Sequence, residues 1–372
     1  MKICEYIPTA SFFVGGGEIY PLLQTKYLAG GGYNVTLVVL KTKNQSEYFK
    51  KYKEDNPNIE IFELESPIEN AYSFSNRELN HDVAHELYFS LGRAFSEHCS
   101  NNNYDLIITH YGPGAVSCPQ NIKQILFLHG VPSAVQPVNV AAVAVSDKLI
   151  AVSKSVAQGW KKMFKIKENI DLVYNAVDIN LYFPINIKKD IDILYLGRLI
   201  EIKGVQHLIN ALKILRDKGY SLELTIAGKG PYEEQLKKLA TKLGINNRIN
   251  FLGYVPEERK LELYNRSKIC VFPSYAKEGV LTTMLEAAST AAPIITANCC
   301  GMVDFIKNGK NGLLFEPKNV DDLANKILLL TNNPEISRKI GSNARKSVEK
   351  EWNWQYHIKK LERVINSMQE CI

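Results

Sequence analysis

The stretch ICVFPSYAKEGVLTTMLEAAS, residues 269–289, decides how we interpret the fold of this chain. Its apolar start, residues 269–272, predicts a buried strand, and the Pro-Ser pair that follows predicts a turn. The segment that ends in LEAAS predicts a helix. A strand, a loop and a helix in succession form the repeating unit of parallel α/β sheets.

The same succession extends along the whole chain in both directions. Seven apolar runs in the first half predict strands: KICEYI, YNVTLVVL, IEIFEL, YDLIITH, QILFLHG, KLIAVS and IDLVYN. Six runs in the second half do the same: IDILYLG, LELTIAG, INFLGYV, KICVFPS, PIITA and GLLFEP. Helix-period segments lie between them, so we expect two Rossmann-like, doubly wound α/β domains that face each other across a cleft.

At 372 residues the chain is too long for one ordinary core. We expect the junction in NLYFPINIKKD, residues 180–190, where a proline and polar residues precede a new strand. The first domain would then cover residues 1–185 and the second residues 186–352. The aromatic and amphipathic segment 353–372 predicts a helix that returns to complete the first domain.

Composition excludes several classes of protein. The chain has seven cysteines without a CxxC pair, which favours a reducing compartment. MKICEYIP predicts a first strand and not a signal peptide, because no h-region or cleavage site follows it. No run of 18 apolar residues predicts a membrane span. No basic-aromatic stripe suggests nucleic-acid binding, and we expect a cytoplasmic protein.

Charge is unevenly distributed along the chain. Residues 1–185 carry 16 Lys and Arg against 18 Asp and Glu, whereas residues 186–372 carry 29 against 21. A basic second half suits an anionic ligand such as a nucleotide diphosphate, although a solvated basic surface would give the same counts. A local cluster of Lys50, Lys51 and Lys53 leaves peripheral membrane contact open.

Two glutamates in the opening stretch, Glu278 and Glu286, are the first candidate site residues. We expect Glu278 on a loop beside Gly279 and Glu286 about two turns into a helix. At a rise of about 1.5 Å per residue they would lie roughly 12 Å apart, with a helix N-terminus between them that favours phosphate. A sugar nucleotide has matching dimensions. The alternative is that both are ordinary helix-end and surface carboxylates.

Other candidates follow predicted strands. Arg198 and Lys203 lie after IDILYL and could stabilise the charge of a leaving diphosphate. Gly15 and Gly16 precede a helix and would let the backbone approach a phosphate. Each has an alternative interpretation, as surface cations and as a flexible turn respectively. His129 could face the cleft or serve as a structural hydrogen-bonding residue.

Metal chemistry is not predicted. His81 and His85 have the spacing of a zinc pair, but the acidic residue between them is Asp82 and no third ligand is evident. We therefore expect no metal site.

Taken together, the motifs resemble family four of the retaining GT-B glycosyltransferases (glycosyl transferases group 1). The resemblance rests on their order along the chain: the GG-x-E loop, the His-bearing strand, VYNAVD, GR with KG, AGKGP, FLGYVP, the paired glutamates, PIITA and NGLLFEP. It covers nearly the whole chain and is densest over residues 197–317.

The resemblance implies roles for the candidate residues. Gly15 and Gly16 would approach the donor phosphates, and Arg198 and Lys203 would grip the diphosphate. Glu278 would contact the transferred sugar, Glu286 would hold the ribose hydroxyls, and His129 would line the cleft near that sugar. The turn formed by Gly253, Tyr254 and Val255 would seat the base. The loop of Gly279, Val280, Leu281 and Thr282 would face the sugar, and Leu281 departs from the Gly or Pro of many relatives.

The function implied by the resemblance is a retaining hexosyltransferase that uses a nucleotide-sugar donor, with a UDP-sugar favoured and a GDP-sugar as the alternative. Its acceptor would be a hydroxyl of a glycan, a lipid-linked molecule or a small molecule. Same-face displacement would require no cofactor and no metal. Two other functions remain open: a UDP-sugar 2-epimerase of the same architecture and a non-catalytic nucleotide-sugar binding protein.

Overall fold

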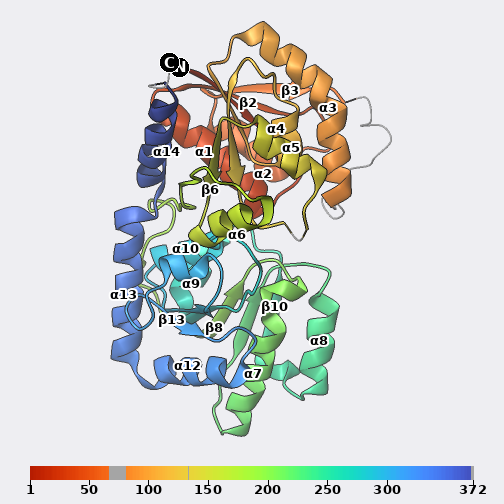
Figure 1. The fold of residues 1–372 in the computed structure, drawn as a ribbon. Coiled ribbons are helices and arrows are strands. Elements are labelled where there is room, and N and C mark those ends of the chain that lie inside the picture. The colour runs from red at the N-terminus through yellow and green to blue at the C-terminus, as the bar shows by residue number, and fades with distance from the viewer. Residues whose placement is uncertain (67–80, 133, 370–372) are drawn as a thin grey trace. The chain divides into compact units, whose positions relative to one another are not determined.

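The computed structural model describes residues 1–66, 81–132 and 134–369. The chain divides into two compact units, which are described separately below. Unit 1 comprises Met1–Val173 with Ile358–Ile372, and unit 2 comprises Tyr174–His357. Figure 1 shows a sheet with helices packed around it in each unit.

Unit 1 contains a parallel sheet of seven strands in the order β3-β2-β1-β4-β5-β6-β7. The strands are β1 (Lys2–Tyr6), β2 (Asn34–Leu40), β3 (Glu60–Leu64), β4 (Leu106–Thr109), β5 (Lys123–Leu128), β6 (Lys148–Ala151) and β7 (Asp171–Leu172). Each apolar run of the first half overlaps one of these strands, although only Asp171–Leu172 of the run IDLVYN forms one. Buried residues dominate β2, β4 and β5, as expected for strands that helices cover on both faces.

Helices connect these strands. They are η1 (Pro8–Ser11), α1 (Gly16–Gly30), α2 (Glu47–Asp55), α3 (His81–Asn102), α4 (Gly112–Val116), α5 (Pro137–Val145) and α6 (Lys154–Phe164). Ser46 and Ser153 cap α2 and α6 by accepting hydrogen bonds from backbone amides of the first turn. The side chains of His81 and His85 lie outside the described residues.

Unit 2 contains a parallel sheet of six strands in the order β10-β9-β8-β11-β12-β13. They are β8 (Ile191–Leu196), β9 (Leu224–Ala227), β10 (Ile249–Gly253), β11 (Ser267–Phe272), β12 (Ile294–Ala297) and β13 (Leu313–Phe315). Each corresponds to one apolar run of the second half. The α/β fold class is therefore confirmed.

Two hydrophobic clusters cover the two faces of this sheet. On β8, Ile193 and Tyr195 belong to one cluster, whereas Leu194 and Leu196 belong to the other. This alternation follows from the two-residue period of a strand. The helices that supply the rest of both clusters, or connect them, are η2 (Glu201–Lys203), α7 (Val205–Asp217), α8 (Glu233–Lys242), η3 (Asn246–Arg248), α9 (Glu257–Arg266), α10 (Thr282–Ser289), α11 (Met302–Phe305), α12 (Val320–Asn332) and α13 (Pro334–Glu351).

The division between the units falls earlier than the junction that we expected. Residues 174–185, which we assigned to the first domain, belong to unit 2. The reason is their packing, because Tyr182 is buried in a unit 2 cluster and its carbonyl accepts a 2.8 Å hydrogen bond from Arg345. The proline and polar residues that suggested a linker follow this anchor.

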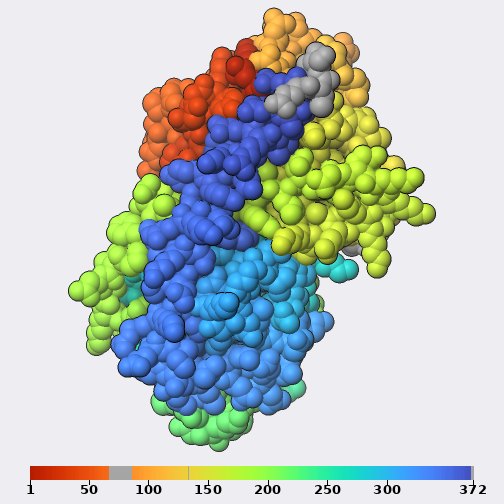
Figure 2. Space-filling view, turned by 60° about the vertical axis from the view of Figure 1, so that its left-hand side comes forward, coloured from red at the N-terminus to blue at the C-terminus, as the bar shows by residue number. Residues whose placement is uncertain are grey.

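The terminal helix α14 (Trp354–Gln369) is divided between the units. Trp354 and His357 belong to unit 2, where His357 Nδ1 lies 2.8 Å from the Tyr174 carbonyl. From Ile358 onward the helix belongs to unit 1, and Figure 2 shows its dark blue residues against the red N-terminal residues of that unit. Among the described residues, no helix combines the length and apolar character needed to cross a membrane.

Candidate functional site

The sheet order of unit 2 reverses direction between β8 and β11. At such a switch point the loops after the two central strands diverge, and they leave a crevice at the carboxyl end of the sheet. Arg198 and Lys203 follow β8, and Glu278 follows β11. The topology therefore brings these three residues to one edge of the sheet.

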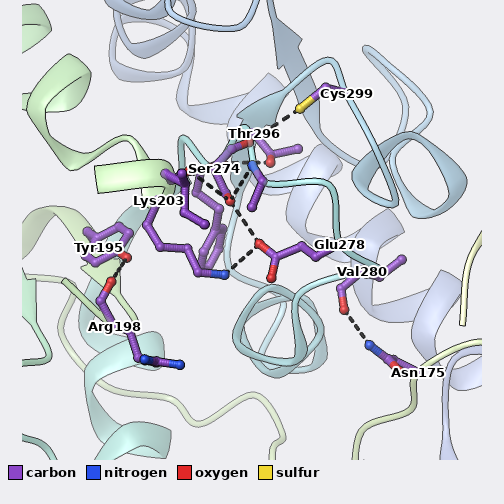
Figure 3. A network of polar contacts seen from close by, with 12 residues as sticks. Asn175, Tyr195, Arg198, Lys203, Ser274, Glu278, Val280, Thr296 and Cys299 are labelled. Atoms are coloured by element: carbon purple, nitrogen blue, oxygen red, sulfur yellow. Dashed lines mark hydrogen bonds and ion pairs between the residues drawn. The ribbon is translucent and has the colours of Figure 1, made fainter. Parts of the chain in front are cut away.

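Lys203 and Glu278 meet directly. Lys203 Nζ lies 2.6 Å from Glu278 Oε1, and Ser274 Oγ donates a 2.9 Å hydrogen bond to the same oxygen (Figure 3). The two ion-paired side chains keep 14% and 29% of their exposure. The carboxylate is thus fixed by two donors and still open to solvent.

The position of Lys203 depends on Gly204. This glycine has φ +75°, and a Cβ on it would lie 2.1 Å from the Pro273 carbonyl oxygen. Only glycine allows the end of η2 to pass so close to the loop that begins at Pro273. The KG pair in the sequence therefore sets the approach of Lys203 to Glu278.

Arg198 is exposed, and only its backbone is held. Its carbonyl accepts a 2.8 Å hydrogen bond from Tyr195 Oη. Within the described residues, its guanidinium makes no hydrogen bond or ion pair, and Figure 3 shows it apart from the Glu278 carboxylate. Arg198 thus presents an unneutralised cation at the edge where Lys203 is already paired.

Glu286 lies deeper in the protein than Glu278. Helix α10 begins at Thr282, so Glu286 is its fifth residue and lies in the second turn, closer to the N-terminus than we expected. Glu278 is in the preceding loop, so the helical rise does not give the separation of the two carboxylates. Leu281 provides no side-chain cap, which leaves first-turn amides for a ligand or solvent.

Glu286 is held by residues of α9. Its Oε2 accepts a 2.8 Å hydrogen bond from Tyr264 Oη and lies 3.7 Å from Lys260 Nζ. Burial raises the pKa of Glu286, and the charge of Lys260 opposes that rise. Burial also lowers the pKa of Lys260, but the carboxylates of Glu286 and Glu257 outweigh it and leave that pKa raised.

The loop from Gly279 to Thr282 is fixed through its backbone. Asn175 Nδ2 donates a 2.7 Å hydrogen bond to the Val280 carbonyl, and the Val280 side chain is buried in the core. A donor contact by Val280 would therefore use its backbone. Leu281 and Thr282 are half-buried and remain available as side chains.

The predicted base-binding turn lies at the end of β10. Gly253 has φ +68°, and its carbonyl accepts a 2.7 Å hydrogen bond from the Gly228 amide. Tyr254 keeps 62% of its exposure, and Val255 is half-buried against the core. An exposed aromatic ring beside a fixed turn is a suitable platform for a planar base.

In unit 1 the glycine cluster begins α1. Gly15 is the N-cap of the helix and Gly16 is its first residue. A Cβ on Gly16 would meet no atom within 4 Å, whereas a Cβ on Gly17 would lie 2.4 Å from Tyr111 Oη. Packing thus requires glycine at position 17, while position 16 leaves open space beside the helix N-terminus.

His129 ends a buried chain of polar groups in unit 1. His129 Nε2 lies 2.9 Å from His110 Nδ1, and His110 Nε2 lies 2.5 Å from Glu5 Oε1. Gln24 Nε2 donates a 3.1 Å hydrogen bond to the same Glu5 oxygen. His110 and His129 follow β4 and β5 directly, so the parallel sheet places them side by side.

Burial decides the protonation of this chain. The side chains of Glu5 and His110 are fully buried, which raises the pKa of Glu5 well above its usual value and lowers the pKa of His110 to about 3. Both shifts favour the uncharged forms. We therefore assign a protonated Glu5 that donates to His110 Nε2, and a His110 Nδ1–H that donates to His129 Nε2.

Sequence reasoning missed the residues that hold the candidates in place. They are Ser274 beside Glu278, Tyr264 and Lys260 beside Glu286, and His110, Glu5 and Gln24 behind His129. A signal existed for His110, because it ends the run YDLIITH as His129 ends QILFLH. Asp178, the last residue of VYNAVD, stabilises a turn, since its carboxylate accepts hydrogen bonds from the Asn180 and Leu181 amides.

The remaining two predictions concern a basic cluster and a metal site. In the basic cluster of α2, acidic partners balance the charge: Lys50, Lys51 and Lys53 pair with Glu47, Asp55 and Glu63. In the part of the chain that the structure describes, no three His, Cys, Asp or Glu side chains gather as a metal site would require.

Two family models match the chain. The model for glycosyl transferases group 1 matches residues 180–347, and the model for glycosyltransferase family 4 matches residues 14–181. An uncharacterized glycosyltransferase of Methanocaldococcus jannaschii is 30% identical over 225 residues, which are 56% of this chain and 57% of its own length. The chain spans 57%, 59% and 45% of the lengths of the first three curated relatives that it matches.

Solved structures share the fold over the full chain. Sucrose-phosphate synthase from Thermosynechococcus elongatus has a TM-score of 0.84 at 19% identity, with both chains covered completely. HepE of Anabaena, solved in complex with UDP-glucose, has a TM-score of 0.79 at 19% identity and covers 99% of this chain and 100% of its own. The chain has the GT-B fold, built from a glycosyltransferase family 4 domain over residues 14–181 and a glycosyl transferases group 1 domain over residues 180–347.

Proposed function

We propose that this protein is a retaining hexosyltransferase that transfers a sugar from a nucleotide-diphosphate sugar to a hydroxyl acceptor. A UDP-sugar is the favoured donor, since HepE was solved with UDP-glucose, and a GDP-sugar is the alternative. The product would be a glycan, a glycolipid or a cell-surface polysaccharide. The observation that carries the proposal is the Lys203–Glu278 pair, with the exposed Arg198 on the same strand-end loop, at the switch point of unit 2.

The charges at this edge suit a departing diphosphate. Bond cleavage leaves negative charge on the diphosphate, and fixed cations that need no reorganisation stabilise such charge best. Arg198 offers a planar guanidinium with several donors, and Lys203 offers a compact ammonium that Glu278 already orients. The first-turn amides of α10 would add further donors.

The two glutamates would have separate roles. Glu278, open to solvent and fixed by Lys203 and Ser274, would accept hydrogen bonds from hydroxyls of the transferred sugar. Glu286, buried and fixed by Tyr264, would hold the ribose. Gly15 and Gly16 would bring backbone to the phosphates, and His129 would contact the sugar. The turn of Gly253, Tyr254 and Val255 would seat the base.

The proposed reaction is a same-face displacement in which a diphosphate oxygen assists deprotonation of the acceptor hydroxyl. It would need no protein nucleophile, cofactor or resident metal. Dialysis against EDTA should therefore leave turnover within about twofold of the untreated enzyme. Loss of activity that Mg²⁺ or Mn²⁺ restores would contradict this part of the proposal.

The test of the function begins with donor choice. A thermal-shift panel of UDP-, GDP- and ADP-sugars should raise the Tm for one nucleotide class, because a ligand that binds only the folded state stabilises it. The preferred donor is then incubated with and without a panel of hydroxyl acceptors. We expect a glycosylated product whose anomeric configuration, measured by NMR, equals that of the donor.

The same assay separates the alternatives. An epimerase would convert the sugar of the donor without an acceptor, whereas a transferase would at most hydrolyse it slowly. Tight nucleotide binding without turnover on any acceptor would indicate a non-catalytic binding protein. Inversion at the anomeric carbon would contradict the retaining mechanism alone.

A further inference from the structure

Two adjacent thiols, Cys299 and Cys300, follow β12 in unit 2 and lie beside the loop that carries Glu278. Both are half-buried, whereas Cys4, Cys99, Cys118 and Cys270 are buried. The proposed transfer reaction uses neither thiol. Their accessibility and their position raise the question of what they could do.

Cys300 lies against the Glu278 loop through the backbone. It has φ +53°, a left-handed conformation that a residue with a side chain adopts at some cost. The next residue, Gly301, donates a 3.1 Å hydrogen bond to the Glu278 carbonyl. A Cβ on Gly301 would lie 2.3 Å from the Gly279 carbonyl carbon, so the two segments pack without space between them.

Cys299 contacts the same loop at Ser274. Its Sγ donates a 3.5 Å hydrogen bond to the Ser274 carbonyl, which is drawn as a dashed line in Figure 3. Ser274 in turn donates to Glu278 Oε1. The thiol pair is therefore connected to the Glu278 carboxylate through Ser274 and to the Glu278 backbone through Gly301.

We propose that Cys300, with Cys299 beside it, is a reversible modification site for low-molecular-weight disulfides, and that its modification displaces the Glu278 loop. The Cys300 thiolate attacks one sulfur of the reagent, RS–SR. A new bond joins Cys300 Sγ to that sulfur while the S–S bond of the reagent breaks. The departing RS⁻ takes a proton from solvent, and a free thiol reverses the exchange.

The surroundings of Cys300 favour its thiolate. The pKa of Cys300 is lowered to about 7, mainly by a hydrogen bond with Cys299 and also by the Glu278 backbone and the charge of Lys277, while burial and the Glu278 carboxylate act in the opposite direction. The same contact raises the pKa of Cys299, and Glu278 and Glu316 add to that rise. Cys300 is thus the attacking sulfur, and the single Cys299 S–H, which donates to the Ser274 carbonyl while Cys300 is a thiol, donates to Cys300 once it is a thiolate.

The expected rate follows from the thiolate fraction. At pH 7 a thiol with a pKa near 7 is about half ionised. A solvent-exposed thiol with the ordinary pKa of 9.0 is about 1% ionised at that pH. A thiolate of lower pKa is intrinsically less nucleophilic, which reduces the gain in rate from its higher ionised fraction. Cys300 should therefore react about fivefold faster than such a thiol.

The experiment treats the reduced, full-length Cys371→Ser variant with glutathione disulfide at pH 6 to 9 and follows each cysteine by peptide mass spectrometry. This background removes the one cysteine outside the described residues. We expect a glutathione adduct of Cys300 whose rate is half-maximal near pH 7 and which dithiothreitol removes. Cys300→Ser should abolish the adduct. Cys299→Ala, which removes the hydrogen-bond donor, should keep it, with the pH dependence moved to higher pH.

Modification of Cys300 no faster than that of the buried cysteines, or only after denaturation, would overturn the site. The effect on the loop is read by hydrogen exchange of residues 274–281, which needs no donor and no activity. We expect at least threefold faster exchange in the adduct than in the reduced protein, and unchanged exchange would overturn the coupling. An accompanying loss of donor affinity rests on the proposed function, and its absence with faster exchange would count against that function alone.

Discussion

The two units share one sheet topology, yet the polar groups at their switch points differ in burial and charge. In unit 2, Lys203 and Glu278 keep 14% and 29% of their exposure and form an ion pair. In unit 1, the side chains of Glu5 and His110 are fully buried, and the directions of their pKa shifts favour a neutral pair. The same position in the fold therefore carries a charged ion pair in unit 2 and a neutral, hydrogen-bonded pair in unit 1.

The difference follows from what covers each strand end. In unit 1, Tyr20 of α1 packs edge-on against both His110 and His129, and Phe127 stacks on His110, which excludes water. In unit 2, the side chains of Lys203 and Glu278 keep part of their exposure, so their charges remain solvated. The comparison predicts that unit 2 residues act on charged parts of a substrate and that unit 1 residues orient His129.

The largest effect should come from removing the cations of unit 2. Arg198→Ala and Lys203→Ala should each lower kcat about 10²- to 10³-fold, because each removes a fixed donor for the departing diphosphate. Steady-state kinetics with the preferred donor measures this. Lys213→Ala, which removes a lysine paired with Asp217 elsewhere in unit 2, is the matched control and should be neutral. Turnover that survives both substitutions would disprove the leaving-group role.

The next effect separates the two glutamates. Glu286→Gln should weaken UDP binding about tenfold in isothermal titration calorimetry, whereas Glu278→Gln should lower kcat with little change in UDP affinity. Glu262→Gln, whose partner is Arg266 on the same helix, controls for loss of a surface carboxylate. The opposite pattern would exchange the roles of the two residues.

A smaller effect tests the chain behind His129. Glu5→Leu removes the donor to His110 Nε2 and should lower kcat about tenfold, since the His129 tautomer is then no longer fixed. Glu5→Gln supplies an N–H in place of the carboxyl O–H and should stay within about twofold of the parent. The pH–rate profile should shift for Glu5→Leu only. If Gln is as damaging as Leu, Glu5 is ionised and our proton assignment is wrong.

The smallest effect concerns stability. Burial raises the pKa of Glu5, so the folded state holds its proton above the usual value near pH 4.5, and stability is lost as pH rises toward the raised pKa. Glu5→Gln removes this loss. Urea unfolding at pH 5, 7 and 9 should show a stability gap in favour of the variant that widens with pH. A constant gap would mean that Glu5 is already ionised in the folded protein.

The pKa of His110 is shifted in the opposite direction, so His110 affects stability at acid pH. Its pKa is lowered to about 3, so its contribution is present above the ordinary value near 6.5 and is lost as pH falls toward 3. Both Glu5 variants should still lose stability as the pH falls from 6.5 toward 3, because His110 remains buried in each.

Local sequence determined the elements of this protein. Each apolar run that we took as a strand overlaps a strand, and one of the helix-period segments between them forms α7, whose buried side includes Val205, Leu208, Ile209, Leu212 and Leu215. These predictions succeeded because burial imposes a period of two on strands and 3.6 on helices, and both periods are visible within ten residues. The order of motifs likewise led to the family.

Tertiary structure decided the contacts of the site and the division of the chain. Lys203 meets Glu278 across 75 residues of sequence, and Glu5 meets His110 across 105. Asn175 donates a hydrogen bond to the Val280 carbonyl across 105 residues, and burial of Tyr182 in a unit 2 cluster makes the start of the expected linker part of unit 2. No local pattern encodes such pairs, because they depend on which strands the sheet makes neighbours. Burial, which sets the proton positions in unit 1, likewise exists only once the chain has folded.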